Sequence, residues 1–188
     1  NNNGWNNNWS TSGFLLFRQK LGKEGRTISA NFRYSFSNND LKGFNRSITR
    51  LDENLDGMWD LNPELVNQRY VQNSNSTSLS GRLVYTEPLS KHLFLEANYN
   101  YSWNRNSSNK DTYDSSTNAE VDGLLVYNAA GEILNSIYSN EILNVSHNHR
   151  AGMNFSYQLK KFRAQLGASV NPTNTYNMTN GKEYSSQV

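Results

Sequence analysis

The sequence contains no cysteine, and this absence excludes two classes of protein. A small secreted domain stapled by disulfides needs cysteine pairs, and a thiolate metal site needs cysteine ligands. The chain also lacks any run of 18 or more apolar residues, so we expect no transmembrane helix. An excess of one charge is missing as well, because the formal net charge is only +2. No basic run provides the groove that nucleic acid needs, so the sequence predicts no nucleic-acid partner.

Apolar residues are scarce. They make up 35% of the 188 residues and the mean hydropathy is −0.82, both low for a domain with a packed core. Asn and Ser together account for roughly three residues in ten, far above ordinary usage. Aromatic residues nevertheless reach 12%, which is more than a disordered chain carries. The composition therefore indicates a structure that buries or anchors aromatic rings.

Strict alternation of apolar and polar residues is the main structural signal. In residues 27–37, every second side chain is apolar, from Ile28 to Phe36. Successive side chains of a strand point to opposite faces, so this segment has one apolar and one polar face. Similar alternation predicts six strands, at about residues 9–21, 26–37, 77–86, 92–104, 145–159 and 162–171.

The connections between the expected strands alternate between short and long. Residues 22–25, 87–91 and 160–161 form short polar turns that join the six strands into three hairpins. The hairpins are separated by long loops at about 38–76 and 105–144. Compact domains rarely contain such long loops, whereas outer-membrane barrels combine short periplasmic turns with long extracellular loops.

These observations predict an all-β fold, an antiparallel up-and-down meander of about six strands that is an incomplete segment of a larger transmembrane β-barrel. Aromatic residues lie toward the loop ends of the strands, where a membrane girdle is expected, at Phe36, Tyr101 and Trp103. Alternation alone also fits a soluble β-sandwich binding module, with carbohydrate as a candidate ligand, and that alternative stays open. Six strands are too few to close a barrel. Because residues 1–8 and 171–188 read as loops and no signal peptide opens the chain, we expect an internal portion of a longer protein, covering 1–188 as one segment.

Three stretches resemble the barrel of TonB-dependent outer-membrane receptors, the outer membrane protein beta-barrel family. They are residues 25–35, residues 85–89 running into 95–101, and residues 155–162. The resemblance implies the bacterial outer membrane as location and a parent barrel with a plug that imports a nutrient ligand with energy from the TonB complex. The partners it implies are outer-membrane lipid, the rest of the parent barrel with its plug, the TonB complex and an unknown nutrient. It implies a transport role for strands and loops, and no enzymatic activity.

One loop has the spacing of a calcium site. Asp52, Asn54, Asp56 and Asp60 place oxygen ligands at positions 1, 3, 5 and 9, with Gly57 at position 6. The glutamate expected at position 12 is displaced by one residue, because Pro63 stands there. Calcium is thus the candidate cofactor, and the alternative is a solvated loop with an Asx-turn.

Other candidate sites have equally plain alternatives. His147 and His149 share a strand face and could hold a metal, or they could be interfacial aromatic side chains. The expected lumen face carries charges that could tune ligand passage, although we favour cross-strand pairing and hydration: Arg33, Arg82, Glu96, Arg150 and Arg163. Loop aromatics could stack on a sugar or pack the loop itself: Trp5, Trp59 and Tyr113. No catalytic constellation is evident, so we expect no enzyme.

Overall fold

The computed structural model describes residues 2–49 and 63–188, and within these residues the chain is built from strands without helices. The strands are β1 (Asn2–Lys20), β2 (Thr27–Thr49), β3 (Glu64–Pro88), β4 (Leu93–Asp114), β5 (Glu120–Val121), β6 (Leu124–Leu125), β7 (Ile133–Leu134), β8 (Asn140–Leu159), β9 (Phe162–Val170), β10 (Thr173–Thr179) and β11 (Lys182–Gln187). No helix in the described part of the chain is long and apolar enough to cross a membrane.

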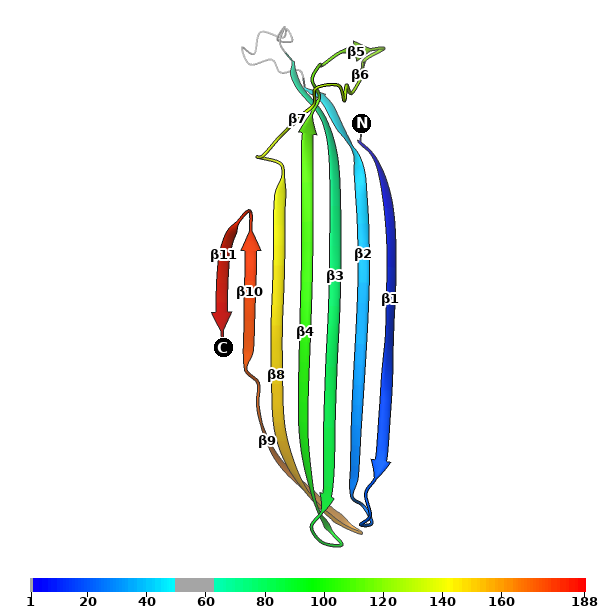
Figure 1. Ribbon diagram of the computed structural model, residues 1–188, viewed down its shortest axis with the longest axis vertical. Helices are drawn as coiled ribbons and strands as arrows, with labels where there is room; N and C mark the ends of the chain where they lie inside the picture. The colour runs from blue at the N-terminus through cyan, green and yellow to red at the C-terminus, as the bar shows by residue number, and fades with distance from the viewer. Residues whose placement is uncertain (1, 50–62) are drawn as a thin grey trace. The chain divides into compact units, whose positions relative to one another are not determined.

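The strands form an antiparallel up-and-down sheet in which neighbours along the chain are also neighbours in space. The order across the sheet is β1-β2-β3-β4-β8-β10-β11, with β7 paired to β4 and β9 paired to β8 (Figure 1). Strands β5 and β6 form a separate two-stranded sheet. The all-β meander predicted from the sequence is confirmed, and the six expected strands correspond to β1, β2, β3, β4, β8 and β9.

The chain divides into two compact units, each made from several stretches of sequence. Unit 1 comprises Asn1–Trp9, Asn38–Ser74 and Ser108–Ile142, and unit 2 comprises Ser10–Ser37, Asn75–Ser107 and Leu143–Val188. Unit 2 contains the short turns and the alternating segments. In its first turn, the Leu21 N–H donates to the Arg26 carbonyl (3.0 Å). In its second, the N–H of Leu89 donates to the Leu93 carbonyl (2.9 Å).

The strands are longer than the alternation predicts. Strand β2 continues to Thr49, β3 begins at Glu64, β4 continues to Asp114 and β8 begins at Asn140. The expectation of loops over residues 38–76 and 105–144 is therefore wrong for much of both ranges. Residues 2–8, expected to be a loop, belong to β1.

Polar side chains explain why these extensions escaped the alternation. Their sequences contain Asn, Ser and Gln on both faces, and these residues bind one another across the strands. In unit 1, the hydroxyl oxygens of Ser74 and Ser108 lie 3.0 Å apart, and the side-chain amide of Gln72 donates to the Ser108 hydroxyl (3.1 Å). In unit 2, Ser76 donates to Asn106 (2.6 Å) and Ser78 donates to Asn104 (2.7 Å). Such cross-strand pairs stabilise a sheet without an apolar face, so the hydrophobic pattern ends before the strands do.

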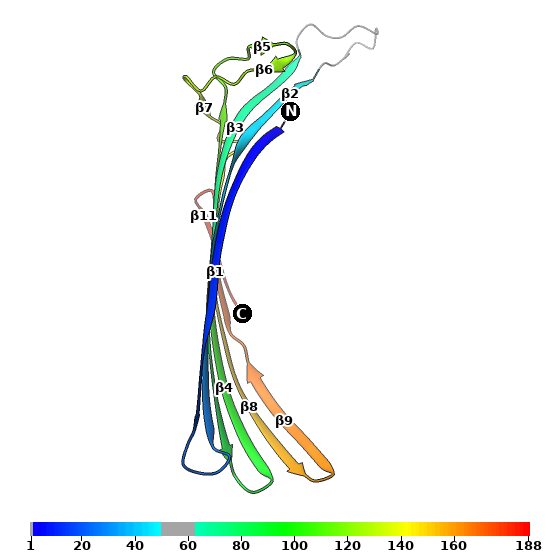
Figure 2. The same ribbon diagram turned by 90° about the vertical axis from the view of Figure 1, so that its right-hand side faces the viewer.

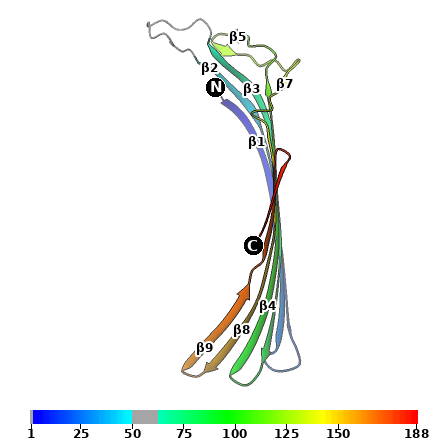
Figure 3. The ribbon, with the colours of Figure 1, turned by 90° about the vertical axis from the view of Figure 1, so that its left-hand side faces the viewer.

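The last 18 residues also contain strands where a loop was expected. Strands β10 and β11 form a hairpin whose turn is Asn180-Gly181, flanked by the pair Thr179 and Lys182. Both turn residues have positive φ, 48° and 76°, as a type I′ turn requires. Between β9 and β10, Pro172 has no N–H to donate. Both strands pair with β8, and Figure 3 shows β9 beside it. The Asn-Gly pair was a readable hairpin signal that the alternation did not capture.

Candidate functional site

The register of β8 and β9 establishes the two faces of the sheet in unit 2. Phe155 lies opposite Leu166, and Leu159 lies opposite Phe162. The intervening positions pair polar residues, such as Ser156 with Gln165. Figure 2 shows β4, β8 and β9 side by side at their turn ends. The alternation predicted for these two strands is thus present as one apolar and one polar face.

The apolar face remains uncovered within the described residues. Large side chains on it are exposed, including Leu15 at 71%, Met153 at 54% and Leu166 at 77%. A shallow depression on this face brings residues of four strands together: Leu15, Phe17, Ala30, Phe32, Leu83 and Tyr99. Among the large aliphatic and aromatic side chains of the described residues, only Leu125, in unit 1, is buried. A sheet that leaves this face open has no conventional hydrophobic core.

The solvent-exposed area of the chain reflects the same lack of a hydrophobic core. The chain exposes 13537 Å², whereas a folded monomer of its 21.5 kDa mass would expose roughly 9,200 Å². The excess corresponds to surface that a monomer in water would normally bury.

A row of tyrosine and histidine rings lies on the apolar face of β4 and β8. The Tyr99 hydroxyl is 2.8 Å from His149 Nδ1, and the Tyr101 hydroxyl is 2.9 Å from His147 Nδ1. The rings of Tyr101 and His149 also contact each other, with centroids 4.9 Å apart. Each ring has an apolar body and a polar group, and the polar groups of the two pairs meet each other on this face.

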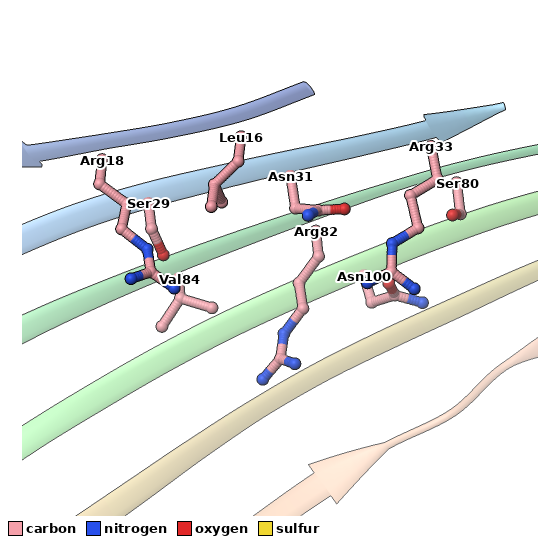
Figure 4. A pocket seen from close by; sticks show the side chains of 9 residues that line it. All are labelled: Leu16, Arg18, Ser29, Asn31, Arg33, Ser80, Arg82, Val84 and Asn100. Carbon is pink, nitrogen blue, oxygen red and sulfur yellow. The ribbon is translucent and has the colours of Figure 1, made fainter. Parts of the chain in front are cut away.

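The polar face of unit 2 is hollowed beside β1, β2 and β3. The hollow is a cavity of about 450 Å³, lined by Arg18, Arg33, Arg82 and neutral polar residues such as Asn31 and Asn100. Figure 4 shows the three arginine side chains extending to the same side of the strands. The sequence predicts this face for Arg33 and Arg82. The alternation also predicts it for Arg18, which is not among the candidate residues, because Arg18 points to the strand face opposite that of Leu15 and Phe17.

Four charged or polar residues join the turn ends of β1–β2 and β3. Arg26 donates two hydrogen bonds to the Glu87 carboxylate, from Nε (2.6 Å) and from Nη2 (2.8 Å). The Tyr85 hydroxyl donates to the same carboxylate (2.6 Å). Lys23 lies 3.2 Å from it. The hydrogen bonds from Arg26 and Tyr85 stabilise the charged form and lower the pKa of Glu87 to about 2. This network holds neighbouring turns together and has no feature of a reacting site.

Unit 1 contains a second network that fastens a returning segment to the long strands. Arg69 donates to Glu132 through Nε (3.1 Å) and forms an ion pair with it, and Tyr127 donates to the same carboxylate. The hydrogen bond from Arg69 lowers the pKa of Glu132, and burial raises the pKa of Tyr127 to about 12. Asn67, which is buried, donates its amide N–H to the carbonyl of Val126 (3.0 Å). The partners Arg69 and Glu132, like Asn67 and Val126, lie about sixty residues apart in the sequence, so no local pattern predicts these contacts.

Two of the aromatic residues expected in loops lie in strands, Trp5 in β1 and Tyr113 in β4, and both contact other side chains of the chain. Trp5 meets the edge of Phe44 at 6.2 Å, and Tyr113 lies under the Arg69 guanidinium at 4.5 Å. Phe44 in turn contacts Tyr127 at 5.2 Å. Trp59 lies outside the described residues. These contacts match the packing alternative more closely than a sugar platform, although Trp5 keeps 57% of its surface exposed.

Of the two candidate metal sites, the acidic loop lies outside the described residues and the histidine pair lies within them. Asp52, Asn54, Asp56 and Asp60 lie outside the described residues. The described parts of the chain hold no group of three or more His, Cys, Asp or Glu side chains arranged for a metal. His147 and His149 each have a tyrosine hydroxyl at Nδ1, as described above.

Comparison with known proteins gives no relative from which a function could be transferred: no family model matches the chain, and no curated protein matches it.

Proposed function

We propose that the chain is a segment of a bacterial outer-membrane transport barrel of the TonB-dependent receptor type. The observation that carries the proposal is a sheet with one exposed apolar face, one hollowed polar face and no core among the described residues. In a membrane barrel the apolar face contacts lipid and the polar face lines a wet lumen. The partners are then outer-membrane lipid, the remaining strands and plug of the parent barrel, the TonB complex and a nutrient ligand.

Strand length supports the proposal. A tilted transmembrane strand needs about 9–11 residues. In unit 2, the five long strands each supply such a stretch, at 10–20, 27–37, 76–86, 93–103 and 148–158. Strand β9 spans Phe162–Val170 and reaches the same length. Most of these stretches have the alternation that lipid contact on one face requires, although β1 departs from it at Phe14 and Leu16.

The rival is a soluble β-sandwich, in which a second sheet covers the apolar face. The described residues supply only the two-stranded β5–β6 sheet besides the main one. A sandwich would therefore need a second sheet from outside the described residues. Within the described residues, no such sheet covers the apolar face of the main sheet.

Site-directed spin labelling of the full-length protein tests the proposal. This chain has no cysteine, so single cysteines can be placed at Phe32, Leu83 and Leu166 on the apolar face, with Asn31 and Gln165 as matched positions on the polar face. In outer-membrane vesicles, labels on the apolar face should be relaxed by oxygen, which concentrates in lipid. Labels on the polar face should be relaxed by a water-soluble nickel chelate.

The opposite result has a clear meaning. Apolar-face labels shielded from both relaxants would indicate a covering sheet and would support the sandwich. Labels reached by the nickel chelate on both faces would indicate that neither face meets lipid, and the membrane proposal would be abandoned.

A further inference from the structure

Three guanidinium groups surround one cavity on the polar face of unit 2. Arg18 comes from β1, Arg33 from β2 and Arg82 from β3, so three adjacent strands contribute one charge each. Figure 4 shows that their side chains extend to the same side of the strands. Asn31, Ser80 and Asn100 line the cavity between them.

The charges in this cavity are not balanced within the described residues. No carboxylate lines it, and none of the three guanidiniums forms an ion pair or hydrogen bond with the described part of the chain. Two arginines elsewhere do form ion pairs, Arg26 with Glu87 and Arg69 with Glu132. The cross-strand pairing that we favoured for lumen arginines is therefore not made at Arg33 and Arg82.

Like charges on neighbouring strands destabilise a sheet, and water or an anion must offset their repulsion. A concave site concentrates the field of its lining charges and raises the local concentration of a counter-ion. The volume of about 450 Å³ falls within the range of small-molecule sites.

We infer that this cavity binds a small solute that carries two or more anionic oxygen groups, such as phosphate, sulfate or carboxylate. The inference deepens the proposed function, and it rests on it, because the polar face must line a water-filled lumen for a solute to reach the cavity. Each guanidinium offers a planar fork of N–H donors that matches two oxygens of such a group. Asn31, Ser80 and Asn100 offer neutral hydrogen-bonding groups that orient the rest of the solute.

Titration calorimetry on the full-length protein in detergent micelles tests the inference, with inorganic pyrophosphate as the probe and sucrose as the neutral comparison. Pyrophosphate should bind, and its affinity should fall as sodium chloride is raised, because salt screens the charges. The double variant R33Q/R82Q should weaken binding by about tenfold for each guanidinium removed, since a hydrogen bond to a charged group contributes that much.

The matched control is Arg163→Gln, which removes the same charge from the same face. Arg163 lines a different cavity, in which Glu96 supplies a negative charge. Its substitution should leave the affinity for pyrophosphate unchanged. Circular dichroism of every variant checks that the β-structure is retained.

Three outcomes would overturn the inference: no pyrophosphate binding, equal binding by sucrose, or equal weakening in R163Q and R33Q/R82Q. If pyrophosphate does not bind and R33Q/R82Q also loses thermal stability, the arginines of the cavity pair with carboxylates of the protein itself. The spin-label experiment separates this result from the proposed function. A protein whose apolar-face labels meet lipid but which binds no pyrophosphate loses only the further inference.

Discussion

Glu87 is held by three side chains at the turn end of β3, and its protonation should be visible in the stability of the protein. Its pKa lies near 2 because Arg26 and Tyr85 donate hydrogen bonds to the charged carboxylate. A carboxyl whose pKa falls on folding stabilises the fold above its ordinary pKa of 4.5 and loses that contribution as the pH falls through its folded value. The contribution is therefore complete above pH 4.5 and is lost between pH 4.5 and pH 2.

We expect Glu87→Gln to lower the melting temperature at neutral pH and to reduce the further loss between pH 4.5 and pH 2. Thermal unfolding in detergent, followed by circular dichroism across this pH range, measures both effects. Glu24→Gln, at an exposed position of the neighbouring turn, is the control and should change neither. Parallel acid profiles of the wild type and E87Q would contradict the assignment.

The ion pair of Glu132 with Arg69 stabilises the segment that carries β5, β6 and β7, as the contacts of Glu87 stabilise the turn end of β3. Arg69 lowers its pKa, so the ion pair is complete above the ordinary pKa of 4.5 and weakens as the pH falls below that value. Glu132→Gln keeps the shape of the side chain and removes its charge. We expect faster cleavage of residues 115–139 by a protease in this variant, by several-fold at neutral pH, because the segment opens locally more often.

The control for this prediction is Glu120→Gln, which removes a charge from exposed β5. Its cleavage rate should equal that of the wild type. Tyr127→Phe should give an intermediate rate, because the tyrosine donates a second hydrogen bond to Glu132 while Arg69 remains. An unchanged rate in E132Q would mean that Asn67 and the backbone hold the segment without the ion pair.

Among the elements, the β10–β11 hairpin depends on its turn more than on its packing. Every residue of β11 is exposed, so few contacts besides the strand pairing hold it. Gly181 has a φ of 76°, which a β-branched residue adopts only at a cost of about 1–2 kcal/mol. We expect Gly181→Val to open this hairpin, with faster amide exchange in β10 and β11 and unchanged exchange in β3 and β4.

Asn180→Gly is the matched control, because glycine adopts the φ of 48° at this position without strain. Its exchange rates should stay close to those of the wild type. Equal protection in G181V would show that pairing with β8, rather than the turn, determines the stability of the hairpin.

The strands illustrate what the sequence could and could not predict. Residues 27–37 alternate without error, and the pairing of Phe155 with Leu166 follows the predicted faces. Alternation ends where Asn and Ser begin to bind across strands, as at Ser74 and Ser108, so the strands extend 5 to 13 residues beyond the predicted ends. The contact between Arg69 and Glu132 joins residues 63 positions apart and had no local pattern. Turn chemistry at Asn180-Gly181, by contrast, was local and readable.

At the scale of the whole molecule, the uncovered apolar face gives the sharpest prediction about environment. Phe155 and Ser156 are neighbours on β8 that point to opposite faces. If lipid covers the apolar face, Phe155→Arg should cost about 2–4 kcal/mol of unfolding free energy in vesicles, as arginine does at a lipid-facing position. Ser156→Arg places the same side chain in the wet lumen and should cost much less.

Urea unfolding of the full-length protein in lipid vesicles measures the difference. Equal costs for the two substitutions would mean that both faces of β8 meet the same environment, which no barrel provides. A greater cost for Ser156→Arg would reverse the assignment of the two faces and, with it, the location of the arginine-lined cavity.

The order of strands across the sheet has a consequence for how the protein is made. Strands β1 to β4 and then β8 pair in the sequence in which a ribosome produces them. Strand β2 follows β1, and β4 follows β3, through a short turn, so little chain entropy is lost when each of these hairpins forms. The sheet can therefore grow by one hairpin at a time, always at its most recent edge. Among the described strands, β1 has a neighbour on one side only, β2, so its other side is free to pair with a further strand.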